Sequence, residues 1–278
     1  MKFQLGCQLK YSLTQASTLV LNISPANNNS QKVLQENLEL DPFLDYEEYV
    51  TPVLGNRYLR LNAPAGSLQV SYQGTVEVSY SYGDWSENSQ SLAEIPPAKL
   101  PLETLSYLYP SRYCQSDRLI KLAQYEFGDL LPDYSRIVAI CNWIYDNVTY
   151  LSGSTNQHTS AFDTATQREG VCRDFAHLGI AFCRALNIPA RFVAAYACGL
   201  EPPDFHACFE AYLENRWFIF DPTRLARRSG LIRVGTGRDA ADVSFATIFG
   251  PATMKQMNIS VKSLEQYPTV TEAAISMD

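Results

Sequence analysis

The sequence predicts an α+β protein in which a small antiparallel β-sandwich precedes a domain of mixed helices and strands. Apolar and polar residues alternate up to about residue 82, as they do in half-buried strands. Beyond residue 101 the apolar residues recur at steps of three and four, which is typical of helices, before strand-like segments return. We therefore expect an N-terminal β-sandwich domain at 1–90, a linker at 91–104 and a second domain at 105–278.

The N-terminal domain contains four clear strand patterns, at 11–15, 18–23, 58–62 and 66–82. Clusters of Asn, Gly and Pro between them are turn signals. Four acidic residues in this region are most simply explained as a solvated loop: Asp41, Asp45, Glu47 and Glu48. The domain has no His and one Cys, so we expect the chemistry elsewhere.

Composition narrows the possible partners and the compartment. The chain has 22 basic and 29 acidic residues, a net charge of −7, which argues against nucleic-acid binding. It has no apolar run of about 18 residues and no hydrophobic stretch behind Lys2, so we expect neither a membrane span nor a secretory signal. Seven Cys without CxxC spacing indicate free thiols in a reducing compartment, so we expect a cytoplasmic protein without a metal site.

The second domain begins with three predicted helices. Ser116 and Asp117 can cap a helix that reaches about Phe127. Asp133 can cap a second helix with an apolar stripe that includes Cys141. A polar loop at 150–160 then leads to a short helix at 162–168.

The segment 170–186 predicts a helix that is apolar on most of its surface and therefore belongs in the core. Gly170 marks its start and Pro189 its end, so Cys172 falls at the N-terminus. Unpaired backbone N–H groups there stabilise a thiolate, which predicts that Cys172 is the most reactive of the seven thiols. The alternative is that Cys172 is one more small buried residue.

A strand at 190–198 and a hairpin follow this helix. If Glu214 and Asn215 form a two-residue turn, Leu213 faces Arg216 across the hairpin. His206 and Asp221 then share one face of the sheet as diagonal neighbours, about 7–8 Å apart at the backbone. A three-residue loop without a bulge would place them on opposite faces.

A Cys at a helix N-terminus, a strand-borne His and a strand-borne Asp suit nucleophilic thiol catalysis. In this arrangement His206 takes the proton of Cys172, and Asp221 orients the imidazole and stabilises its charged form. The second histidine near the nucleophile, His177, is better explained by packing or a helix hydrogen bond, and His158 by exposure in a polar loop. Cys141, Cys183, Cys198 and Cys208 lie in apolar patterns and are expected to be inert.

Three motifs resemble the signature blocks of the bacterial transglutaminase-like superfamily: Gly-Val-Cys-Arg-Asp-Phe-Ala-His at 170–177, Asp-Phe-His-Ala-Cys-Phe-Glu-Ala-Tyr at 204–212 and Trp-Phe-Ile-Phe-Asp-Pro-Thr-Arg at 217–224. The resemblance covers about 102–250, and the first ninety residues resemble the β domain that often precedes this core in bacterial members. It implies a papain-like core whose Cys helix packs on an antiparallel sheet, acyl-enzyme chemistry and no obligatory cofactor.

Two features depart from the animal transglutaminases: Arg173 follows the Cys where they have Trp, and no acidic cluster suggests calcium sites. We therefore expect a thiol hydrolase of peptide or carboxamide bonds, acting on a peptide or protein substrate. A protein-glutamine transglutaminase and a non-catalytic peptide-binding module are the alternatives, and the oligomeric state stays open.

The remaining site predictions concern the edges of the cleft. One oxyanion donor should be the backbone N–H of Cys172, and the other should come from the loop 150–160, where Gln157 and Thr155 are the candidates. Asp239 or Asp242 can border the cleft, although solvated loop acids explain them better. A last strand is expected at about 257–264, within the second domain.

Overall fold

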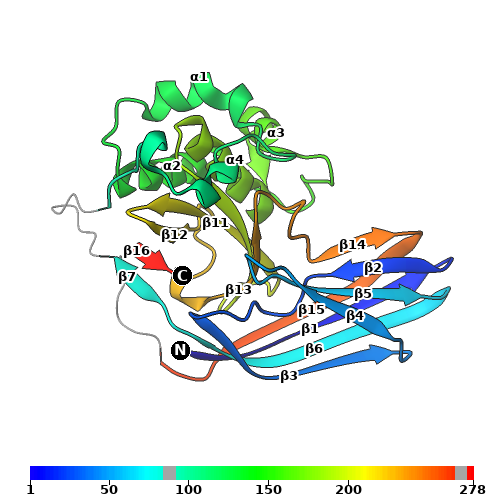
Figure 1. The fold of residues 1–278 in the computed structure, drawn as a ribbon. Helices are drawn as coiled ribbons and strands as arrows, with labels where there is room; N and C mark the ends of the chain where they lie inside the picture. The colour runs from blue at the N-terminus through cyan, green and yellow to red at the C-terminus, as the bar shows by residue number, and fades with distance from the viewer. Residues whose placement is uncertain (84–91, 267–273) are drawn as a thin grey trace.

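The structure, a computed structural model, describes residues 1–83, 92–266 and 274–278. Figure 1 shows an elongated β-rich part beside a part in which the helices gather on one side of a short sheet. The predicted α+β class with an N-terminal β domain is confirmed. Residue 91, where the predicted linker begins, lies outside the described residues, as does the end of the predicted N-terminal domain at 84–90.

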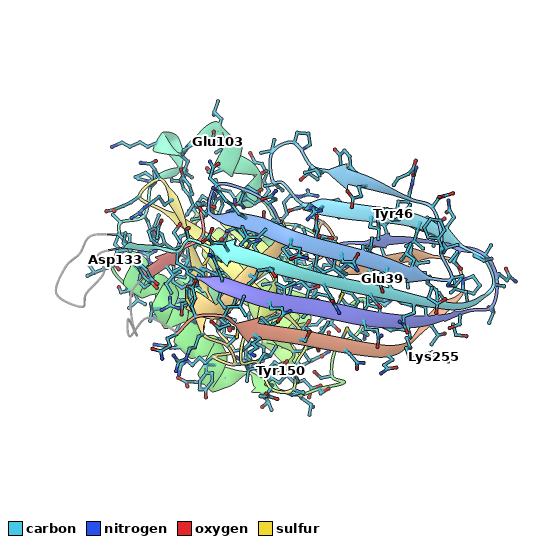
Figure 2. All side chains as sticks on the ribbon, turned by 90° about the horizontal axis from the view of Figure 1, so that it is seen from below. Glu39, Tyr46, Glu103, Asp133, Tyr150 and Lys255 are labelled. Carbon is cyan, nitrogen blue, oxygen red and sulfur yellow. The ribbon has the colours of Figure 1, made fainter. Side chains whose placement is uncertain are left out.

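Two four-stranded antiparallel sheets form the β-rich part. The first has the order β15-β1-β6-β3, with β15 at Ala252–Ser263, β1 at Lys2–Leu13, β6 at Gly66–Val78 and β3 at Gln31–Asp41. The second has the order β14-β2-β5-β4, with β14 at Ala246–Phe249, β2 at Ser17–Leu21, β5 at Arg57–Ala63 and β4 at Tyr46–Val50. Figure 2 shows the first sheet from outside, with Glu39 on β3 and Lys255 on β15.

The placement of the last long strand differs from the prediction. Strand β15 pairs along its length with β1, where Cys7 faces Ile259, and β14 pairs with β2. The assignment of this strand to the second domain is therefore wrong, because residues 246–263 complete the N-terminal sandwich. The pairing joins residues some 250 positions apart, and the local pattern of alternation carries no information about such a partner.

Glu47 and Glu48 lie in β4, and not in a loop as predicted. All five residues of β4 are exposed, and the strand is the edge of its sheet. Charged residues on an edge strand oppose pairing with other chains.

Four helices and one sheet form the second part. The helices are α1 at Ser116–Phe127, α2 at Tyr134–Asn147, α3 at Ala161–Gln167 and α4 at Cys172–Ala185. The antiparallel sheet has the order β12-β11-β10-β13, with β12 at Arg216–Phe220, β11 at Phe205–Leu213, β10 at Ala190–Ala197 and β13 at Leu231–Gly237. Twelve of the fourteen residues of α4 are buried, as its apolar pattern predicts.

Shorter elements connect these units. They are β7 at Ser81–Gly83, β8 at Thr149–Tyr150, β9 at Glu169–Gly170 and β16 at Ala274–Ser276, with 3-10 turns η1 at Pro97–Lys99, η2 at Leu102–Tyr107 and η3 at Arg228–Gly230. The turn η1 lies within the predicted linker and η2 begins in it, and buried Leu100 belongs to a small cluster with Tyr107 and Trp217. The division of the chain into domains at 91–104 stays a prediction.

The sheet of the second part joins the two parts of the molecule. Alternate residues of β10 face opposite cores, so Phe192 packs with the helices and Val193 with the sandwich. The sandwich is also fixed to this sheet by hydrogen bonds: Tyr196 donates to the carbonyl of Ile23 (2.8 Å), and Arg233 N donates to Gln31 Oε1 (2.8 Å). The segment that follows β2 is thereby held against the sheet.

The predicted hairpin is confirmed. Leu213 pairs with Arg216, and the turn residues Glu214 and Asn215 have φ of 45° and 63°. Positive φ at both positions is typical of the type I′ turn, whose twist matches that of the flanking strands.

Among the described residues, no helix is both long and apolar enough to cross a membrane.

Candidate active site

Cys172 is the first residue of α4, and a buried carboxylate fixes the backbone that leads into it. Asp174 has no exposed surface, and its Oδ2 accepts a hydrogen bond from Val171 N (2.9 Å). A Cβ at Gly170 would stand 2.7 Å from the Cβ of Asp174, so only glycine permits this approach. Asp174 therefore sets the position of the helix start through this hydrogen bond, and its role is more than a favourable interaction of its charge with the helix dipole.

Thr155 supports this arrangement from the loop. Its Oγ1 donates to Asp174 Oδ1 (3.1 Å) and accepts from Arg173 (2.5 Å). The side chain of Thr155 is not among those that line the cavity beside Cys172. The structure therefore gives Thr155 a supporting position for the helix start and not the cleft position that was predicted.

His206 and Asp221 meet on one face of the sheet. His206 Nε2 lies 2.8 Å from Asp221 Oδ2, and both side chains are almost fully buried. The other carboxylate oxygen accepts hydrogen bonds from Thr223 N (3.0 Å) and Thr223 Oγ1 (2.7 Å). Because both oxygens are engaged, the orientation of the carboxylate is fixed.

Cys172 is the second neighbour that acts on the ring of His206. Nδ1 is buried and has no well-aligned hydrogen-bond partner among the described residues, but the thiol of Cys172 is close enough to stabilise the protonated ring. Burial on its own lowers the pKa of His206; the charge and hydrogen bond of Asp221, together with Cys172, outweigh it and raise the pKa to about 10. This environment favours the imidazolium form of His206.

Tyr150 is a site residue that no sequence motif singles out. Strand β8 pairs in parallel with β9, and Tyr150 faces Gly170, two residues before the nucleophile. Burial, followed by the charge of Cys172, raises the pKa of Tyr150 to about 12, and its hydroxyl interacts with both the backbone and the thiol of Cys172. The hydroxyl therefore stays protonated and can donate a hydrogen bond at this position.

A cavity of about 490 Å³ opens beside the thiol. Gln157, Cys172, Arg173 and His206 are among the residues that line it. Gln157 is exposed, and its backbone carbonyl accepts a hydrogen bond from Tyr113 Oη (2.8 Å). The structure brings Gln157 to the cleft as predicted, while its role as an oxyanion donor stays a prediction.

Asp239 and Asp242, the two acids considered for the border of the cleft, are held by hydrogen bonds and an ion pair. Asp239 is buried and accepts hydrogen bonds from Tyr113 N and Ala241 N, and Asp242 pairs with Arg238. Neither is a lining residue of the cavity, so both organise the loop beside it.

His177 packs in the core, as expected. Its Nε2 accepts a hydrogen bond from Ala240 N (3.1 Å), and its ring lies between those of Tyr113 and Phe192. Burial holds the pKa of His177 well below its ordinary value, so its ring stays neutral.

His158 is exposed, as expected. Within the described ranges there is no group of three or more His, Cys, Asp or Glu that could hold a metal ion.

Comparison with known proteins agrees with this arrangement. Residues 120–222 match the model of the Transglutaminase-like superfamily, and residues 1–102 match that of the Bacterial transglutaminase, N-terminal domain. A solved structure described as a candidate cysteine protease from Cytophaga hutchinsonii is 45% identical, with a TM-score of 0.94 over 100% of this chain and 98% of that one. The chain belongs to the transglutaminase-like superfamily. Membership supports an enzyme with cysteine hydrolase or transglutaminase-like chemistry in general.

This transglutaminase-like protein also has relatives in mycobacteria. An uncharacterized protein of Mycobacterium leprae is 27% identical over 240 residues, which cover 80% of this chain and 82% of the relative. An uncharacterized protein of Mycobacterium tuberculosis is 27% identical over 246 residues, which cover 80% and 77%.

We expect brief treatment with iodoacetamide near pH 6 to modify Cys172 before the other thiols. Burial raises the pKa of the Cys7 thiol to about 11 and those of Cys114 and Cys141 to about 12, and it also raises those of Cys183 and Cys208. Cys172 is half-buried, so reagent can reach it, and it neighbours the imidazolium of His206, a setting typical of reactive cysteines. Peptide mapping by mass spectrometry gives the order of modification. Faster reaction of Cys7 or Cys114, with Cys172 unmodified, would contradict the assignment of the nucleophile.

Proposed function

We propose that this transglutaminase-like protein is a thiol hydrolase that cleaves peptide or carboxamide bonds through an acyl-enzyme on Cys172. The observation that carries the proposal is the buried pair of His206 Nε2 and Asp221 Oδ2, 2.8 Å apart, with Cys172 as the other neighbour that stabilises the charged ring. The description of the Cytophaga hutchinsonii structure as a candidate cysteine protease supports it. The cytoplasmic location expected from the free thiols stays part of the proposal.

The reaction has two steps. The thiolate of Cys172 attacks the substrate carbonyl carbon, and His206 gives its proton to the departing nitrogen, which leaves as an amine or as ammonia. Water then attacks the thioester while His206 accepts a proton, and the carboxylic acid product and the free thiol are released. In both steps the backbone N–H of Cys172 would donate a hydrogen bond to the oxyanion, and the hydroxyl of Tyr150, which interacts with Cys172, is a candidate for the second donor.

Amine transfer is the second candidate, and Asp204 favours it. This carboxylate lines the cavity. A carboxylate at this place attracts a protonated amine toward the thioester. A non-catalytic peptide-binding role has less support, because nucleophile, base and orienting carboxylate are all present, and the base and the carboxylate form a close pair.

We expect hydrolysis to exceed amine transfer, because a half-buried nucleophile next to an open cavity admits water to the thioester. The test supplies a glutamine-containing peptide with a fluorescent primary amine and measures ammonia release, peptide cleavage and amine incorporation together. Incorporation that outpaces both hydrolytic products at modest amine concentration would reverse this ranking. Asp204→Asn serves as a matched variant, since it should lower incorporation more than hydrolysis.

A further inference from the structure

The β-sandwich forms one wall of the cavity that contains Cys172. Asn22 follows β2, Ala246 begins β14, and Met254 and Met257 lie on β15; all four line the cavity. The N-terminal part of the chain is therefore placed to contact whatever enters the site.

Asn22 is unusual among these lining residues. It has no exposed surface, and neither its Oδ1 nor its Nδ2 has a hydrogen-bond partner among the described residues. Its backbone is fixed, because Asn22 N donates to the carbonyl of Phe245 (3.0 Å). A Cβ at Gly235 would stand 3.0 Å from Asn22 Nδ2, so glycine at this position allows the carboxamide to lie close to β13.

A buried carboxamide without partners is unfavourable unless a ligand or water supplies them. A neutral amide is the group that complements it fully, because each amide then donates one hydrogen bond and accepts one. The surrounding wall is apolar, with Phe192, Phe205, Val234 and Val243 among its members. Such surroundings disfavour a charged ligand and strengthen an amide pair.

We propose that Asn22 recognises a neutral amide of the substrate, either a peptide unit or a carboxamide, in the cavity beside Cys172. This assignment rests on the proposed function and adds a specificity-determining residue from the N-terminal domain to it. Because Asn22 is sealed from bulk solvent, the entering group must displace neighbouring side chains to reach it. Met254 and Met257 are unbranched and can adapt their shape to an entering group.

The test uses aldehydes, which add reversibly to a thiol: a carbon–sulfur bond forms and the aldehyde oxygen takes a proton. N-acetyl-phenylalaninal carries a peptide-like amide that 3-phenylpropanal lacks, and 5-oxopentanamide carries a carboxamide that 5-methylhexanal replaces with an isopropyl group. The measurement is the aldehyde concentration that half-protects Cys172 from iodoacetamide. It is made on the wild type, on Asn22→Leu, which keeps the size but loses both polar atoms, and on Asn22→Ala in case the first variant fails to fold.

In the wild type we expect at least one amide-bearing aldehyde to protect at about tenfold lower concentration than its amide-free match. In Asn22→Leu this preference should fall below about twofold, with protection by the amide-free aldehyde little changed. Asn258→Leu makes the same substitution at an exposed site on β15 outside the cavity, and it should keep the wild-type preference. The pair of aldehydes that shows the amide preference tells whether Asn22 recognises a peptide unit or a carboxamide.

Two results would overturn the assignment. The first is that the wild type shows no amide preference, and the second is that the preference is unchanged in both Asn22 variants. Either result means that Asn22 does not bind an amide of the substrate, as when water satisfies its carboxamide. If no aldehyde protects Cys172, or if Cys172 is not the thiol that is alkylated, the proposed function fails together with this inference.

Discussion

We expect Cys172→Ala to lower kcat by at least about 10⁴-fold, because no other group can form the acyl-enzyme. The variant should fold normally, since Cys172 is half-buried at the start of α4 and the helix entry is held by Asp174. Turnover is measured as ammonia release and peptide cleavage on the same substrates, and folding by thermal melting.

The matched control is Cys198→Ala. Cys198 is also a half-buried thiol, but it lies just beyond β10, against the carbonyl of Val261, and does not line the cavity. Its activity should stay within about twofold of the wild type. Substantial residual turnover in Cys172→Ala, or an equal loss in Cys198→Ala, would be incompatible with the proposed nucleophile.

The sequence predicts the meeting of His206 and Asp221 because the signals for it are local. Alternation fixes which residues share a face, and the turn chemistry of Glu214 and Asn215 fixes the register. The start of α4 is equally local, since Gly170 and the apolar spacing that follows define it. The start of this helix positions Cys172, and the hairpin positions His206 and Asp221.

The sequence does not predict the features that depend on pairing between distant segments. Tyr150 reaches Cys172 through the two-residue pairing of β8 with β9, which is too short to leave an alternating pattern. Asn22 reaches the cavity because β14 and β15 close the N-terminal sandwich. A polar residue after a strand is ordinarily a turn residue, and only the three-dimensional arrangement shows that this one is buried without a partner among the described residues.

We expect Asp221→Asn to lower kcat/KM by less than Cys172→Ala does and to leave measurable turnover. An Asn oxygen can still accept a hydrogen bond from His206 Nε2. The Asn amide would then face Thr223 N, which now donates to Asp221 Oδ1 (3.0 Å), so two donors would oppose one another. This conflict adds a cost that a simple exchange of acceptors would not have. A loss as complete as that of Cys172→Ala, with folding intact, would show that Asp221 does more than orient His206.

The same variant should change the pH dependence of the reaction. In the wild type the pKa of His206 is raised from its ordinary value of 6.5 to about 10, so the imidazolium persists well into alkaline solution. Without the Asp221 charge this pKa falls, and the alkaline limb of the kcat/KM profile should move down by at least about one pH unit.

The stability of the folded protein should also depend on pH through His206, and it should fall as the pH rises. A folded pKa above the unfolded one means that the His206–Asp221 pair stabilises the fold fully below about pH 6.5, and that this contribution is lost as the pH rises through about 10. The Tm difference between wild type and Asp221→Asn should therefore shrink between pH 6.5 and 10. Asp163→Asn, which removes the carboxylate that caps α3, provides the control: it should lower Tm without moving the alkaline limb. An unmoved alkaline limb in Asp221→Asn would mean that His206 is not the group that titrates there.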